Sequence, residues 1–166
     1  MIIANLILKE DKLIKEEYFL SSFSLFTRKS IKEFIKLISK ELYKDCPNKL
    51  TEYTHTFDST NYYFYTKKSN DITVVLTIKN EDTSLTEIIN KINTELKQCD
   101  TGNDTLDEVN KELEETKNIL KLTLDSVMQR GEKLDKLVEQ SEELSIQSKA
   151  LFKAAKKQNS WCCKFS

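Results

Sequence analysis

The pattern of apolar and polar positions divides the chain into parts with different periodicities. Five runs in the first half have the length and the composition of strands: the first two are rich in apolar residues, and the last three are rich in Thr, Tyr, Phe, Val and Ile. Short polar stretches typical of turns, among them the charged tip Lys9–Lys12, separate most of these runs. The predicted strands are residues 2–8, about 12–20, about 50–57, 61–67 and 72–79.

Two segments instead show the helical period of 3.6 residues. Each begins with a Ser-x-x-Glu capping box, at Ser30–Glu33 and at Ser84–Glu87, which predicts where the helix starts. The apolar stripes are Ile31, Phe34, Ile35, Ile38 and Leu42 in the first helix, and Leu85, Ile88, Ile89, Ile92 and Leu96 in the second. Hairpin-length connections favour an antiparallel sheet with helices packed on it, so residues 1–98 are expected to form one α+β domain.

After a short linker, residues 99–104, the period changes to 3.5, and a third capping box begins at Thr105. Such a repeat predicts a long helical coiled coil over residues 105–159. Most seam positions are apolar. The seam positions are Leu106, Val109, Leu113, Thr116, Leu120, Thr123, Val127, Arg130, Leu134, Leu137, Ser141, Leu144, Ser148, Leu151, Ala155 and Gln158.

A helix this polar outside its seam needs partner helices, because propensity alone does not hold it together. It either folds on meeting other proteins or forms a permanent homo-oligomeric stalk. Arg130, within the seam, favours the first alternative, because a homo-oligomer in register would stack arginine on arginine. Partner helices that offer amide oxygens would satisfy its five N–H donors. The remaining alternative is that Arg130 snorkels out of the seam.

Composition narrows the classes of function. The 166 residues have a net charge of −1, but residues 104–143 carry net −6 and residues 144–166 net +5. With two glycines and one proline, the chain has no glycine-rich phosphate loop, and no apolar run approaches the roughly 18 residues that span a bilayer. Four cysteines without a signal peptide indicate a reducing, cytosolic setting. Cys46, Cys99 and His55 lack zinc-ligand spacing, so we expect no metal and no cofactor.

The last residues, 160–166, have the features of a lipidated tail. Cys163 begins a four-residue prenylation box ending in Ser166, which favours farnesyl, and Cys162 is a candidate palmitoylation site. Two lipids, or one lipid and basic residues, give stable anchoring where one lipid alone binds reversibly. The basic residues are Lys149, Lys153, Lys156 and Lys157.

Three stretches resemble known sequences, in the same order. Residues 127–134 (VMQRGEKL) resemble the centre of the R-SNARE motif, with Arg130 at its ionic layer. Residues 21–34 are similar to the start of the first helix of a longin domain, and residues 157–166 to the tail of lipid-anchored longin R-SNAREs, the Ykt-type synaptobrevin homologues.

This resemblance implies a longin (profilin-like) domain with a five-stranded antiparallel sheet flanked by helices. It also implies zippering with three Q-SNARE helices into a four-helix bundle, with Arg130 bonding three glutamine amides, to drive vesicle docking and fusion. The chain would be no enzyme, would bind no nucleic acid or small-molecule substrate, and would cycle from cytosol to Golgi, ER-derived, endosomal or vacuolar membranes. The alternative is a longin-type trafficking adaptor or tether whose coiled coil drives no fusion.

Leu37 lies off the apolar stripe of the first helix and is expected to face away from the sheet. Beside Leu25, Phe26 and Phe34, it is a candidate for an autoinhibitory patch that receives the SNARE segment or the farnesyl chain. The linker of about six residues is short for the family, so the sequence leaves open whether the SNARE segment folds back onto the domain.

Overall fold

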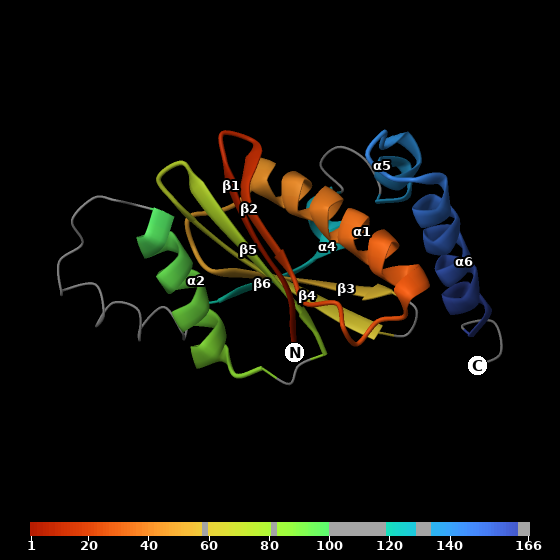
Figure 1. Ribbon diagram of the computed structural model, residues 1–166, viewed down its shortest axis with the longest axis horizontal. Helices are drawn as coiled ribbons and strands as arrows, with labels where there is room; N and C mark the ends of the chain where they lie inside the picture. Colours follow the sequence, from red (N-terminus) through yellow and green to blue (C-terminus); the bar gives the residue numbers. More distant parts are fainter. Residues whose placement is uncertain (58–59, 81–82, 100–118, 129–133, 163–166) are drawn as a thin grey trace.

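The structure is a computed structural model that describes residues 1–57, 60–80, 83–99, 119–128 and 134–162 (Figure 1). Its elements are β1 (Ile2–Lys9), β2 (Lys12–Tyr18), α1 (Leu25–Lys44), β3 (Thr51–Phe57), β4 (Thr60–Ser69), β5 (Ile72–Lys79), α2 (Leu85–Cys99), β6 (Leu120–Thr123), α4 (Leu124–Met128), α5 (Leu134–Gln140) and α6 (Ile146–Cys162). The five predicted strands and the two predicted helices of the first half are all present.

A six-stranded sheet in the order β2-β1-β5-β4-β3-β6 forms the centre of the molecule. The first five strands pair antiparallel, as expected. The turn between β1 and β2 is Glu10-Asp11, and both residues have positive φ, as a two-residue type I′ hairpin requires.

The sixth strand corrects the expectation of five antiparallel strands. β6 comes from the heptad segment and pairs parallel with β3, so the sheet is mixed. The pairing has a physical reason, because β3 would otherwise be an edge strand with a row of unpaired backbone groups. A short strand of the same chain therefore covers this edge.

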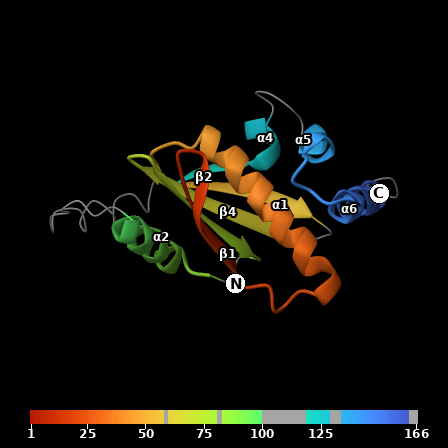
Figure 2. The same ribbon diagram turned by 45° about the horizontal axis from the view of Figure 1, so that its top comes forward.

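Helices pack on both faces of the sheet (Figure 2). Ile31, Ile35, Ile38 and Leu42 of α1 enter a core with side chains from one face, and Ile88, Ile92 and Leu96 of α2 enter a second core on the other face. Strand residues alternate between the two cores, with Leu6 on the α1 side and Ile7 on the α2 side. The predicted apolar stripes thus face the sheet.

The predicted start of α1 is wrong by almost two turns. The helix begins at Leu25 after Ser24, whose extended backbone accepts hydrogen bonds from the N–H groups of Thr27 and Arg28. Ser30 is buried inside the helix. The pattern did not indicate the true start, because the apolar residues of the first turn are exposed and do not belong to the stripe that faces the sheet. At α2 the capping box is confirmed, since the backbone N–H of Glu87 donates to Ser84 Oγ at 3.2 Å.

The described part of residues 105–159 is not one long helix. It consists of β6, α4, α5 and α6, which lie against β3 and α1 (Figure 1). Without partner helices, the apolar side chains of this segment are buried on the domain instead, and the path over its surface breaks the helix. Among the described residues, no helix combines the length and the apolar character that crossing a bilayer requires.

Candidate functional site

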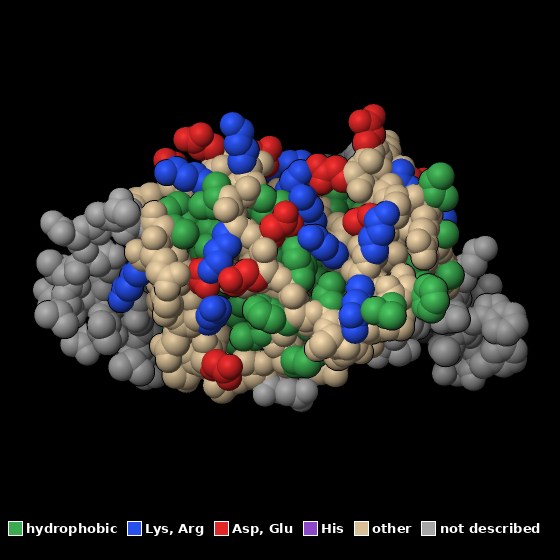
Figure 3. All heavy atoms as spheres, viewed as in Figure 1, with side chains coloured by type: hydrophobic (Ala, Val, Ile, Leu, Met, Phe, Trp, Pro, Cys, Tyr) green, Lys and Arg blue, Asp and Glu red, His purple; other side chains and the backbone are tan. Residues whose placement is uncertain are grey.

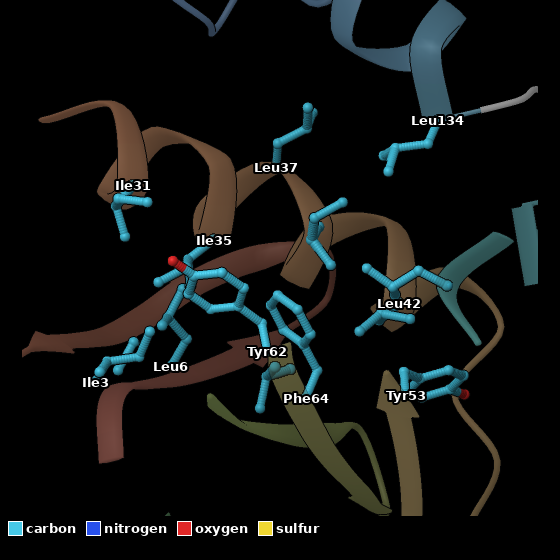
Figure 4. Close-up of a cluster of buried hydrophobic side chains, with 14 of the residues drawn as sticks. Ile3, Leu6, Ile31, Ile35, Leu37, Leu42, Tyr53, Tyr62, Phe64 and Leu134 are labelled. Carbon is cyan, nitrogen blue, oxygen red and sulfur yellow. The ribbon is translucent and has the colours of Figure 1, made fainter. Parts of the chain in front are cut away.

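The outer face of α1 is the centre of the contact between the domain and the heptad segment. Leu37 points away from the sheet toward Leu134 of α5, whereas Ile35 of the same helix points to the sheet (Figure 4). Leu37 is only 6% exposed and shares a core cluster with Leu134 and Val138 of α5. An apolar side chain on the outer face of a surface helix is thus covered by the heptad segment.

An aromatic cluster joins α6 to α1 and β3. The ring of Phe152 lies 5.7 Å from the rings of both Phe34 and Phe57, measured between centroids. These side chains, with Leu151 and others, leave a cavity of only about 10 Å³ between the two helices. The contact is therefore packed like a protein core rather than laid loosely on the surface.

His55 of β3, the one histidine of the chain, lies at the edge of this aromatic cluster. Its ring centroid is 5.7 Å from that of Phe34, and its buried Nε2 has no hydrogen-bond partner among the described residues. Burial lowers the pKa of His55 below its ordinary value, and the charge of Asp125 in α4 opposes this only in part. Burial in the folded chain thus favours the neutral imidazole.

A polar contact fixes the beginning of α6. Glu33 Oε2 of α1 accepts hydrogen bonds from Ser148 Oγ at 2.6 Å and from both the N–H and the Oγ of Ser145 at 2.9 Å. Burial raises the pKa of Glu33, but these hydrogen bonds and the charge of Lys29 outweigh it, so the pKa lies below its usual range. The carboxylate of α1 therefore stays ionised while it holds α6.

Further polar contacts hold β6. The backbone N–H of Leu120 donates to the Leu50 carbonyl oxygen at 3.3 Å. Lys121 Nζ lies 3.5 Å from Glu52 Oε1, and the hydroxyl of Tyr65 donates to the other oxygen of Glu52 at 2.7 Å. Glu52 is buried, so Lys121 supplies the positive charge that its burial requires.

The predicted seam positions and the two tail cysteines differ in where they lie. Within the described residues, Leu134, Leu144, Ser148 and Ala155 are buried, Val127, Leu137, Ser141 and Leu151 are half-buried, and Leu120 and Thr123 are exposed. Gln158 and Cys162 belong to the last turns of α6. Leu106, Val109, Leu113, Thr116, Arg130 and Cys163 lie outside the described residues.

Sequence reasoning missed three buried side chains of the heptad segment: Leu124, Val138 and Phe152. Each lies four residues after a seam position, at a point where the heptad pattern places the next seam position three residues on. An isolated helix has a period of 3.6, so its apolar stripe includes the i+4 neighbour as well. Testing this period alongside the heptad would have found all three.

Comparison with known proteins finds relatives of the heptad segment. Residues 105–164 match the model of the Synaptobrevin family. Over 59 residues, 36% of this chain, the identity is 54% to "Synaptobrevin homolog ykt6" of Schizosaccharomyces pombe and 58% to "VAMP-like protein YKT62" of Arabidopsis thaliana. The second Arabidopsis thaliana relative, "VAMP-like protein YKT61", is 50% identical over 78 residues, 47% of this chain. The chain spans 30%, 30% and 37% of these relatives' lengths, about a third.

Proposed function

We propose that this chain, whose residues 105–164 match the Synaptobrevin family model and are similar to Ykt-type homologues, acts as an R-SNARE in vesicle transport. The observation that carries the proposal is the family match over the heptad seam that contains Arg130. In this function, the seam zips from Leu106 toward Gln158 with three Q-SNARE helices, and burial of apolar side chains supplies the work that draws two membranes together. No covalent bond changes, so the proposal needs no catalytic group.

Arg130 sets the register of the proposed bundle. Its guanidinium offers five N–H donors and accepts no hydrogen bond, so its burial requires oxygen acceptors from the other helices. Three glutamine side chains at the same level would supply neutral amide oxygens. A bundle shifted by one turn would leave the cation against apolar side chains, which is costly, so the register is determined by this layer.

The folded-back arrangement supports an autoinhibited state, in which the heptad segment is held on the chain's own domain; we call the segment stored in this state. Leu134 and Leu144 are seam positions, and in the structure they are buried in one core cluster with residues of α1. The same side chains do not pack against the domain and against partner helices at once, so assembly competes with this contact. Leu37, at the centre of the contact, is the proposed autoinhibitory residue.

The membrane end of the proposal rests on the sequence of the tail. Cys163 would carry farnesyl and Cys162 palmitate, and together with the basic residues of α6 they would anchor the chain on cytosolic membrane faces. The anchor would be reversible because palmitoylation is reversible, and farnesyl alone binds a membrane only weakly. A reversible anchor suits a segment that is stored on its own domain, because the chain then moves between cytosol and membrane.

The alternative is an adaptor or tether whose coiled coil binds a fixed partner without fusion. The identity of residue 130 separates the two functions. In a glutamine-layer bundle, Arg130→Leu leaves three amides buried without a partner and weakens assembly, whereas in a plain coiled coil a leucine in the seam stabilises it.

The experiment is capture of the full-length chain by three immobilised glutamine-bearing SNARE helices, compared between the wild type, Arg130→Leu and Arg130→Lys. The proposal expects capture of the wild type, a complex of lower thermal stability with Arg130→Leu, and an intermediate result with Arg130→Lys, which keeps the charge but not the planar fork. A more stable complex with Arg130→Leu would favour the tether.

A further inference from the structure

Exposed apolar side chains gather where the chain enters α1. Phe19 lies before the helix, and Leu25 and Phe26 form its first turn with 76% and 82% of their surface exposed. Phe23 lies between them and is half-buried. We call Phe19, Phe23, Leu25 and Phe26 the α1-entry surface. A group of exposed apolar side chains marks an interaction site more often than a scattered exposed leucine does.

The α1-entry surface is rigidly supported. The N–H of Phe19 donates to the Ile3 carbonyl oxygen at 2.8 Å, which ties the segment to β1. Arg28 donates from Nε to the Phe23 carbonyl oxygen at 3.0 Å and from a terminal nitrogen to that of Ser21 at 3.1 Å. Because the backbone is already ordered, little conformational entropy is lost when these side chains bind.

Basic side chains accompany the α1-entry surface, although Glu33 directly follows them in the sequence. Residues 19–32 contain Arg28, Lys29 and Lys32 and no acidic residue. Lys79 Nζ lies 4.6 Å from the ring centroid of Phe23, and the side chain of Lys29 is well exposed although it also lies 3.7 Å from Glu33. Apolar side chains face the viewer around the start of α1 with Lys and Arg side chains among them (Figure 3).

The direction of α6 brings the end of the described chain to the side of the molecule where α1 begins. Glu33 contacts Ser148, and one turn earlier in α1 Ser30 lines a cavity together with Leu151. The two helices therefore run antiparallel, and α6 extends toward the end of the molecule where α1 begins (Figure 1).

We propose that the α1-entry surface binds the interface of an anionic bilayer. Leu25 and Phe26 enter the boundary between headgroups and acyl chains, and Lys29, Lys32 and Lys79 lie at the level of the headgroups. Side chains this exposed protrude rather than line a groove, which suits insertion into lipid better than a packed protein interface. The surface lies outside residues 105–164, so the inference does not rest on the proposed SNARE function.

The test is sedimentation of the full-length, lipid-free chain (Cys162→Ser and Cys163→Ser) with vesicles of phosphatidylcholine, with and without phosphatidylserine. We expect binding to the phosphatidylserine vesicles that weakens at high salt. Replacing both Leu25 and Phe26 with Ser should lower the vesicle partition coefficient by about tenfold or more. The reason is that burying even one large apolar side chain raises affinity by about tenfold.

Ile146→Ser is the matched control, because Ile146 is 88% exposed at the start of α6, outside the α1-entry surface. Circular dichroism confirms that each variant folds, and these exposed positions have no part in the core. Unchanged binding by the Leu25→Ser, Phe26→Ser chain, or an equal loss with Ile146→Ser, would overturn the proposal. So would self-association that depends on Phe26 without vesicle binding, which would make the surface an interface between copies. Assembly of the Leu25→Ser, Phe26→Ser chain with glutamine-bearing helices in solution tests the SNARE function separately.

Discussion

Glu33 of α1 accepts a hydrogen bond of 2.6 Å from the hydroxyl of Ser148, a residue 115 positions later that belongs to the predicted seam. The same oxygen accepts two hydrogen bonds from Ser145, the residue before α6. A serine expected to face partner helices is therefore bonded to the chain's own domain, and the carboxylate determines where α6 begins.

Replacing Glu33 with Gln should loosen α6 without unfolding the sheet. The substitution removes the charged acceptor, and a hydrogen bond to a charged group contributes about 1.5–3 kcal/mol. We therefore expect the free energy of docking of α6 on α1 to fall by about 2 kcal/mol. Hydrogen exchange should be faster by one to two orders of magnitude for residues 146–156 and unchanged for β1 and β5. Glu87→Gln, on α2, is the control and should change neither.

Phe152 distinguishes the folded-back state from the proposed bundle, because it is buried in the structure but is not a seam position. Phe152→Ala removes a ring from the aromatic cluster and should destabilise the docking of α6 by about 3 kcal/mol. The same change should leave the melting temperature of an assembled bundle nearly unaltered. Leu151→Ala, at the neighbouring seam position, should lower that melting temperature; equal effects of the two variants on the bundle would contradict the assignment.

The pH dependence follows from His55. Its pKa in the folded chain is lowered from the ordinary value of 6.5, so the free or unfolded state binds more protons in this range. The stability of the closed state is present in full above that value and is lost as the pH falls through it toward the lowered pKa. Protection of the amides of residues 119–156, taken relative to the intrinsic exchange rate at each pH, should therefore be lower at about pH 5.5 than at about pH 7.5.

His55→Phe is the control for this prediction, because it fills the same place in the aromatic cluster and does not titrate. It should remove most of the change between these two pH values. Glu33 and Glu95 also have lowered pKa values, but their effect on stability appears at lower pH. A carboxylate loses its contribution to stability only when the pH falls low enough to protonate it. A pH dependence that persists in His55→Phe would assign it to another group.

The fold of the first half could be predicted because its signals are local. Alternation and the 3.6-residue stripes each depend on side chains within one element, and they located five strands and two helices. The start of α1 could not be found this way, because Leu25 and Phe26 face solvent and break the stripe. The membrane contact proposed above would account for their exposure.

The sequence left the folded-back segment open for a different reason. Its partner surface, the outer face of α1 with Leu37, lies about a hundred residues away along the chain, and a 3.5-residue seam is equally compatible with partner helices and with a groove on the domain. Leu37 itself was a signal, since an off-stripe leucine indicated an apolar outer face. That β6 would extend the sheet could not be inferred, because four residues carry too little pattern.

The most direct test of the account is the rate at which the full-length chain assembles with three glutamine-bearing SNARE helices, compared between the wild type and Leu37→Glu. A carboxylate against Leu134 should release the folded-back segment, so Leu37→Glu is expected to assemble about tenfold faster or more and to show faster amide exchange over residues 119–156. Ile14→Glu, an exposed position on β2, should match the wild type. Equal rates and unchanged exchange in Leu37→Glu would contradict a stored SNARE segment, as would self-association that ignores the partner helices.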